Sequence, residues 1–160
     1  MSQKRAAVLV VNPSRAEAVE AATVLASLLQ KADFDLFTIS DVSISGVTNS
    51  AAENLPEIEI AVVLGGDGTI LRGAELTRER NIPLLGINIG HVGFMAEVIR
   101  PEISAVAKSV IDKSYGLDSR MVLAYEVIRN GKVIDTGWAL NEVTVERQHN
   151  TMVELFVKID

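Results

Sequence analysis

Cysteine is absent from the sequence, and histidine occurs only twice. Without cysteine, these residues form neither disulfides nor thiolate metal sites. The histidines, His91 and His149, are far apart and show no metal-ligand spacing, so no residue is assigned as a metal ligand. Positive charge is also scarce: 15 lysines and arginines stand against 21 aspartates and glutamates, for a formal net charge of −6. Because binding to a phosphodiester backbone requires clustered lysine and arginine, this composition argues against nucleic acid as a partner.

Long hydrophobic runs are missing near the start of the chain. The longest clean apolar run there, Ala6–Val11, has six residues. A signal peptide needs about 7–15 apolar residues and a transmembrane helix about 18 or more. We therefore expect a soluble, cytoplasmic protein that has no membrane partner.

The overall composition of the 160 residues is typical of a globular protein, with 48% hydrophobic and 22% charged residues. That length accommodates one ordinary domain, or one complete domain and part of another. Strand-like and helix-like patterns alternate through the first 116 residues. Strongly apolar runs, typical of strands buried on both faces, occur at 6–11, 58–64 and 84–87. A weaker strand pattern covers 34–39, and helical patterns cover 14–31, 69–80 and 101–114.

This alternation predicts an α/β fold with an open, mostly parallel, Rossmann-like sheet and flanking helices. Two serine–glutamate pairs, Ser14 with Glu17 and Ser50 with Glu53, have the spacing of a capping box. We expect Ser14 to cap the helix over 14–31, and Ser50 to cap a short helical turn.

The pattern changes after Gly116. Strand patterns follow one another at 121–128, 132–139, 142–146 and 152–159, and Asn130-Gly131 is a strong hairpin signal. Four strands make a thin sheet with exposed edges. We therefore expect an α/β domain over residues 1–116, which contains the glycine-rich segment Gly65–Thr69. Residues 117–160 are predicted to be the first strands of an antiparallel β domain that continues in a longer protein.

The segment Gly65-Gly66-Asp67-Gly68-Thr69 stands where a buried strand ends and a helix begins. Ligands of open α/β sheets bind at the carboxyl ends of the strands. Glycine permits positive φ and has no Cβ, so backbone N–H groups can approach a phosphate at the positive end of the helix dipole. Asp67 is suited to orient a hydroxyl nucleophile, accept its proton or hold Mg²⁺. The residue types equally permit a glycine-rich turn in which Asp67 only caps the helix.

Three sequence blocks resemble those of the NAD kinase family in order and spacing: Leu64–Arg72, Pro83–Phe94 and Leu140–Val143. The glycine–aspartate motif of the first block is shared with diacylglycerol and sphingosine kinases and with phosphofructokinases, whereas the second and third blocks separate NAD kinases from those relatives. The resemblance implies a phosphofructokinase-like fold. It also implies phosphoryl transfer from ATP, or from polyphosphate, to the adenosine ribose 2′-hydroxyl of NAD, giving NADP with Mg²⁺ or another divalent cation.

The resemblance also implies roles for individual residues. Asp67 matches the catalytic aspartate, which acts on the 2′-hydroxyl as that oxygen attacks the γ-phosphate. The residues that match nucleotide-binding positions are Gly66, Asp67, Gly68, Arg72, Asn141 and Glu142. Homo-oligomers are usual for this family, so the same is expected of the full-length protein.

The sequence departs from the family because the glycine-, serine- and threonine-rich segment that completes the nucleotide site is not within residues 1–160. We therefore expect this chain to be inactive alone. Two alternatives stay open. A lipid kinase core shares the Asn12-Pro13 corner, although the Ser-Gly-Lys run that follows it in those enzymes is replaced here by Ser14-Arg15-Ala16. The other alternative is a non-catalytic nucleotide-binding module.

Overall fold

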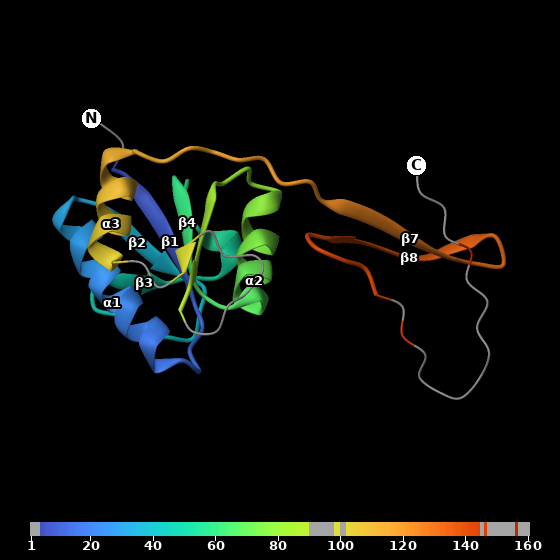
Figure 1. Cartoon of the computed structure of the whole chain (residues 1–160), viewed down its shortest axis with the longest axis horizontal. Helices are drawn as coiled ribbons and strands as arrows, with labels where there is room; N and C mark the ends of the chain where they lie inside the picture. Colours follow the sequence, from blue (N-terminus) through green and yellow to red (C-terminus); the bar gives the residue numbers. More distant parts are fainter. Residues whose placement is uncertain (1–3, 90–97, 100–101, 145, 147–155, 157–160) are drawn as a thin grey trace. The chain divides into compact units, whose positions relative to one another are not determined.

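The computed structural model describes residues 4–89, 98–99, 102–144, 146 and 156. The chain divides into two compact units, Met1–Asp118 and Ser119–Asp160 (Figure 1). None of the helices within the described residues is long and apolar enough to cross a membrane.

Within the described residues, the first unit contains a six-stranded sheet with the order β3-β2-β1-β4-β5-β6, and all its strand pairs are parallel. The strands are β1 (Ala6–Val11), β2 (Asp35–Thr38), β3 (Val47–Asn49), β4 (Ile60–Gly65), β5 (Leu84–Asn88) and β6 (Val98–Ile99). The helices are α1 (Ala16–Lys31), α2 (Asp67–Arg78), α3 (Ile103–Asp112) and the 3₁₀ turn η1 (Ala52–Asn54). This confirms the predicted parallel α/β sheet. The short strands β3 and β6 were not predicted.

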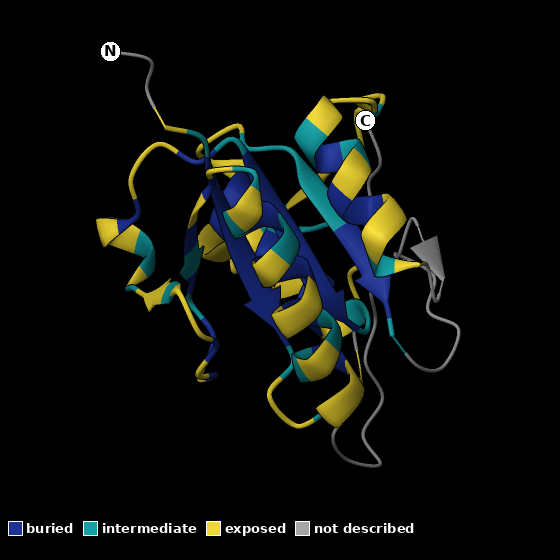
Figure 2. Cartoon of the chain, turned by 90° about the vertical axis from the view of Figure 1, so that its left-hand side faces the viewer, coloured by how far each residue is buried: buried dark blue, intermediate teal, exposed yellow. Residues whose placement is uncertain are grey.

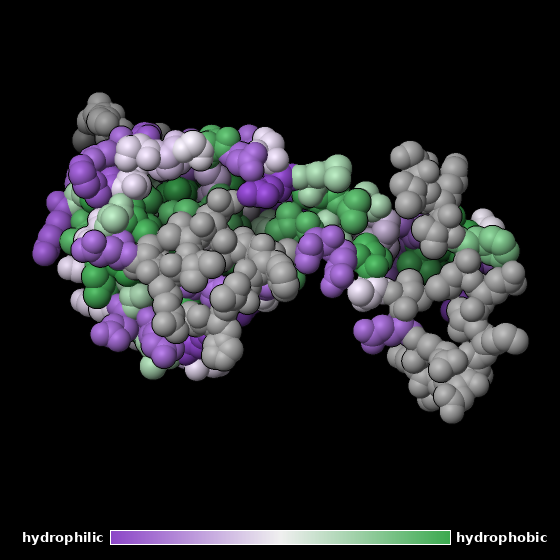
Figure 3. Space-filling model, in the orientation of Figure 1, coloured by the Kyte–Doolittle hydropathy of each residue, from purple (hydrophilic) through white to green (hydrophobic). Residues whose placement is uncertain are grey.

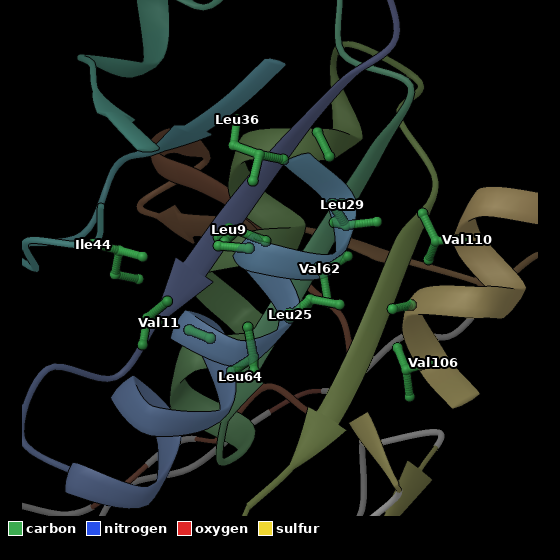
Figure 4. Packing of buried hydrophobic residues seen from close by; sticks show 14 of the residues in the cluster. Leu9, Val11, Leu25, Leu29, Leu36, Ile44, Val62, Leu64, Val106 and Val110 are labelled. Carbon is green, nitrogen blue, oxygen red and sulfur yellow. The ribbon is translucent and has the colours of Figure 1, made fainter. Parts of the chain in front are cut away.

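Helices cover both faces of this sheet (Figure 1). On one face, α1 and α3 pack against the central strands, and Leu9 of β1 lies in the same buried cluster as Leu25 and Val106 (Figure 4). On the other face, Val8 of β1 lies in a second cluster with Ile70 of α2. Because successive strand residues point to opposite faces, a strand between two helical layers needs apolar residues at every position.

Each α-helix of the first unit buries one side and exposes the other (Figure 2). The buried residues of α1 recur at helical spacing and are Ala18, Ala22, Leu25, Ala26 and Leu29. This apolar stripe explains why the helical periodicity could be recognised in the sequence.

Both predicted capping boxes are wrong. Arg15, not Ser14, is the N-cap of α1, and no side-chain hydrogen bond caps it. The Asn12 Oδ1 accepts the Ser14 N–H at 3.0 Å, which is the donor that Glu17 would accept in a capping box, and so forms a local turn ahead of the helix. Similarly, Ala51 is the N-cap of η1, and the Ser50 hydroxyl donates to the Ala51 carbonyl at 3.1 Å.

The second unit contains an antiparallel hairpin of β7 (Leu123–Arg129) and β8 (Lys132–Ala139). Asn130 and Gly131 have φ angles of 51° and 72°, as a two-residue hairpin turn requires, so the predicted hairpin is confirmed. The strand predicted over 142–146 is wrong for its described residues, none of which lies in a strand. A strand needs a partner for its backbone groups, and no described segment pairs with this one. Of the strand predicted over 152–159, only Phe156 is described, and it lies outside any strand.

The hairpin leaves large hydrophobic side chains exposed, which Figure 3 shows as hydrophobic surface on this unit. Those on the two strands are Leu123, Val127, Ile128, Val133 and Ile134. Two strands alone enclose little apolar area, so the described residues of this unit form no core comparable to that of the first.

Candidate functional site

The strand order creates a crevice at the carboxyl ends of β1 and β4. The chain leaves β1 through α1 toward β2 on one side, and leaves β4 through α2 toward β5 on the other. Connections that diverge in this way open a crevice between two adjacent strands, and open α/β sheets bind their ligands there. Asn12 donates its backbone N–H to the Leu64 carbonyl at 3.0 Å and so joins the two strand ends.

A pocket of ≈ 430 Å³ occupies this position. The residues that line it are Asn12, Pro13, Arg15, Gly66, Asp67, Gly68, Thr69 and Arg72. The structure therefore brings together four of the six residues that the sequence suggested for nucleotide binding. The other two, Asn141 and Glu142, are exposed residues that follow β8 in the second unit.

Asp67 is the first residue of α2, and Gly66 is the N-cap. The alternative in which Asp67 serves as the helix cap is therefore wrong. The carbonyl of Gly66 accepts the N–H groups of Thr69 and Ile70, at 2.9 and 3.1 Å, which closes the first turn of the helix. This arrangement sets a carboxylate at the positive end of a helix dipole, inside the pocket.

Glycine is present for different structural reasons at the three positions before Thr69, which are Gly65, Gly66 and Gly68. A Cβ on Gly65 would overlap the Thr69 side chain, so this glycine is required by packing. A Cβ on Gly66 or Gly68 would meet nothing within 4 Å. None of the three has a positive φ, so the expectation that they provide a left-handed conformation is wrong. What Gly66 and Gly68 provide is open space in front of the helix N-terminus, where a phosphate could approach the backbone.

Two arginines contribute positive charge to this pocket. Arg15 is half-buried, and its Nη1 donates to the Ile89 carbonyl at 3.1 Å. Arg72 is exposed and lies one helical turn after Gly68 on α2. Sequence reasoning did not include Arg15 among the site residues. The available signal was its position just after β1, which becomes informative only once β1 is known to lie beside β4.

The second sequence block, Pro83–Phe94, contributes β5 to the same edge of the sheet. Asn88, the last residue of β5, is 1% exposed and lies opposite Gly65 in the β4–β5 register. Residues 90–94 of this block are outside the described residues, as are both histidines of the sequence.

Comparisons with known proteins all identify NAD kinases as similar to this chain. Residues 7–115 match the family model of the ATP-NAD kinase N-terminal domain. The chain is 33% identical to NAD kinase 2 of Streptomyces coelicolor, over 98% of this chain and 55% of that relative. It is 32% identical to the NAD kinase of Rhodococcus erythropolis, over 99% of this chain and 56% of the relative. The chain thus spans about half the length of the curated relatives it matches.

Among solved structures, the crystal structure of yeast NADH kinase complexed with NADH is similar in fold. Its TM-score is 0.69 at 18% sequence identity, over 88% of this chain and 48% of that chain. This likeness supports the fold, and the family match rests on the sequence comparisons. The chain belongs to the NAD kinase family.

Proposed function

We propose that this chain carries the catalytic aspartate of an enzyme that phosphorylates NAD to NADP. The observation that carries the proposal is the position of Asp67 at the N-terminus of α2, in a pocket with two arginines at the switch point of the sheet. A carboxylate in a phosphate-binding pocket opposes anion binding, so it requires a chemical task. Accepting the proton of a hydroxyl nucleophile is such a task.

In the proposed reaction, the adenosine ribose 2′-oxygen of NAD attacks the γ-phosphorus of ATP. A bond forms between that oxygen and phosphorus, and the bond to the β–γ bridging oxygen breaks, with its electron pair leaving on ADP. The proton of the 2′-hydroxyl passes to the Asp67 carboxylate and then to solvent. Little covalent work is left to the protein, because phosphoryl transfer depends on positioning and on stabilisation of charge.

The residues around Asp67 suit this charge stabilisation. Gly66 and Gly68 leave the helix N-terminus open to phosphate oxygens, and Arg72 adds a guanidinium on the same helix. The resemblance assigns Asn141 and Glu142 to hydrogen bonds with NAD, and we retain that assignment as part of the proposal. Asn offers both donors and acceptors, and Glu offers acceptors, to ribose or base edges.

A resident metal ion does not fit the residues of the pocket. No group of three or more His, Asp or Glu side chains suited to a metal occurs within the described residues. The pocket holds one carboxylate and two arginines, which disfavours a bare cation. We propose that Mg²⁺, or another divalent cation, enters as part of the ATP substrate, bound to its phosphates.

The test is NADP formation from NAD, ATP and Mg²⁺, measured in parallel on residues 1–160 and on the full-length protein. We expect activity in the full-length protein and none in residues 1–160, because this chain spans about half of its curated relatives. Polyphosphate replaces ATP as the phosphate donor in a second series of assays.

Phosphorylation of diacylglycerol or a sphingoid base, with no NADP formed, would instead favour the lipid kinase. Binding of NAD without any turnover would favour the non-catalytic module. A cytoplasmic location and a homo-oligomer stay predictions.

A further inference from the structure

We propose that Arg15 binds the phosphates of the phosphoryl donor, and that the β1–α1 loop is the donor side of the pocket. This inference rests on the proposed function, because it assigns one substrate of that reaction to a particular loop. It adds a residue that the family resemblance did not provide.

The loop that carries Arg15 is a tight turn built by its own sequence. The Arg15 N–H donates to the Asn12 carbonyl at 3.2 Å, which closes a β-turn over Asn12-Pro13-Ser14-Arg15. Asparagine at the first position and proline at the second are favoured in such turns, and the fixed φ of proline restricts the loop. Asn12 closes the turn a second time, because its side chain accepts the Ser14 N–H at 3.0 Å. The sequence therefore specifies where Arg15 leaves the turn.

The Arg15 side chain is also held in place. Its Nη1 donates to the Ile89 carbonyl at 3.1 Å, immediately after β5. The guanidinium is thus tied to the ends of two strands, β1 and β5, that flank β4 in the sheet. A guanidinium has five N–H donors in a planar fork. The bond to Ile89 uses one of them and restricts the side chain, so less rotamer entropy is lost when a phosphate binds to the others.

Arg72 is the competing candidate for the same task, and its environment differs. It is exposed on α2, where solvent screens its charge, whereas Arg15 is half-buried. Arg72 also lies on the same helix as Asp67, whereas Arg15 comes from a separate loop that lines the pocket. A donor phosphate and an acceptor hydroxyl must meet from two directions for in-line transfer. We therefore assign the acceptor hydroxyl and the transferred γ-phosphate to the α2 N-terminus, and the remaining donor phosphates to Arg15.

The first experiment measures binding of inorganic tripolyphosphate to residues 1–160 by isothermal titration calorimetry. Replacing Arg15 with alanine removes charge-assisted hydrogen bonds, so we expect the affinity to fall by about tenfold or more. Arg15→Lys keeps the charge and loses the planar fork, and it should give an intermediate loss. Arg78→Ala removes an exposed charge at the far end of α2 and serves as the matched control.

Three results of this titration would overturn the assignment. They are equal binding by wild type and Arg15→Ala, an equal loss in Arg78→Ala, and a loss carried by Arg72→Ala while Arg15→Ala binds normally. Arg15→Lys keeps the test decisive if Arg15→Ala fails to fold, because binding by Arg15→Lys equal to wild type also contradicts the role of the fork.

The second experiment uses the full-length protein and separates the two substrates. Arg15→Ala should raise the KM for ATP by about tenfold or more and change the KM for NAD by less than about threefold. A purely structural role would change both constants together and lower the melting temperature. NADP formation with an unchanged KM for ATP overturns the role of Arg15 alone. Tripolyphosphate binding that depends on Arg15, without any NADP formation, overturns the proposed function alone.

Discussion

Arg5 and Glu59 form a two-pronged ion pair, with 2.8 Å between Nε and Oε2 and 2.5 Å between Nη2 and Oε1. Arg5 directly precedes β1 and Glu59 directly precedes β4, so the pair joins the amino ends of the two central strands. The same guanidinium donates to the carbonyls of Val110 and Ile111, at 2.8 and 2.7 Å, in the last turn of α3. Arg5 therefore holds together the amino ends of β1 and β4 and the last turn of α3, at the opposite end of the two strands from the crevice.

The Arg5–Glu59 pair predicts a specific pH dependence of stability. The hydrogen bond from Arg5 lowers the pKa of Glu59 below its ordinary value of 4.5, and the Lys113 ammonium at 3.3 Å lowers it further. A lowered folded-state pKa means that this stabilisation is fully present above pH 4.5 and is lost as the pH falls through the folded pKa. We expect Glu59→Gln to lower the free energy of unfolding by about 2 kcal/mol at neutral pH.

Urea unfolding of both proteins at a series of pH values tests this prediction. The difference between wild type and Glu59→Gln should shrink below pH 4.5, because Glu59 is then increasingly protonated in both states of the wild type. Glu53→Gln, which removes an exposed carboxylate from η1, is the control and should have little effect. A difference that does not change between neutral and acidic pH would contradict the role of the ion pair.

Replacement by alanine should destabilise the protein at one glycine of α2, Gly73, and leave its stability nearly unchanged at another, Gly68. A Cβ on Gly73 would lie 2.5 Å from Val63 Cγ2 and 3.0 Å from Leu84 Cδ1. Gly73→Ala should therefore destabilise the protein by about 1–3 kcal/mol, although alanine is the better helix former. A Cβ on Gly68 would meet open space, so Gly68→Ala should leave stability within about 1 kcal/mol of wild type.

The same pair separates packing from ligand binding. Gly68→Ala fills the space in front of the helix N-terminus, so it should lower NADP formation by the full-length protein by about tenfold or more. Thermal unfolding and turnover of the two variants are measured together. Full activity in Gly68→Ala would show that no ligand approaches the backbone at this position.

Much of the α/β fold could be predicted from the sequence because its signals are local. Residues buried on both faces leave an unbroken apolar run in β1 and β4, and the one-sided burial of α1 leaves a periodic pattern. The turn at Asn130-Gly131 requires left-handed φ angles that few residue types adopt, so it too could be identified. In each case the property that shapes the structure, which is burial or a left-handed backbone, also restricts which residue types occur at those positions.

The composition of the pocket could not be predicted in the same way, because it depends on which strands are neighbours. Arg15 and Asp67 are 52 positions apart in the sequence, and only the β1–β4 pairing brings their loops to one crevice. The capping boxes failed for a related reason. At Ser14 the serine–glutamate spacing was present, but the Asn12 side chain accepts the Ser14 N–H and α1 has Arg15 as its N-cap. A spacing rule carries no information about such competing partners.

Replacing Ser40 and Ser14 with alanine tests which of their hydrogen bonds stabilise the loops that follow β2 and β1. Ser40 is 2% exposed, and its Oγ accepts the Val11 N–H at 2.8 Å, at the carboxyl end of β1. Ser40→Ala leaves a buried donor without its partner and should cost about 1–3 kcal/mol of stability. Ser14 is exposed and caps nothing, so Ser14→Ala should cost less than about 0.5 kcal/mol. Chemical denaturation measures both. A loss of about 1 kcal/mol in Ser14→Ala would indicate a functioning capping box after all.

Asp67→Asn tests the proposed chemistry most directly, because it removes the proton acceptor while keeping the size of the side chain. In the full-length protein we expect turnover to fall by about 100-fold or more, since general base catalysis contributes about that much. NAD binding should stay within a few-fold, because the pocket's glycines and arginines are unchanged. Glu75→Gln removes an exposed carboxylate from the same helix and should leave turnover at the wild-type level. Turnover retained in Asp67→Asn would mean that the 2′-hydroxyl loses its proton to another group, and that the carboxylate at the start of α2 serves only to interact with the helix dipole.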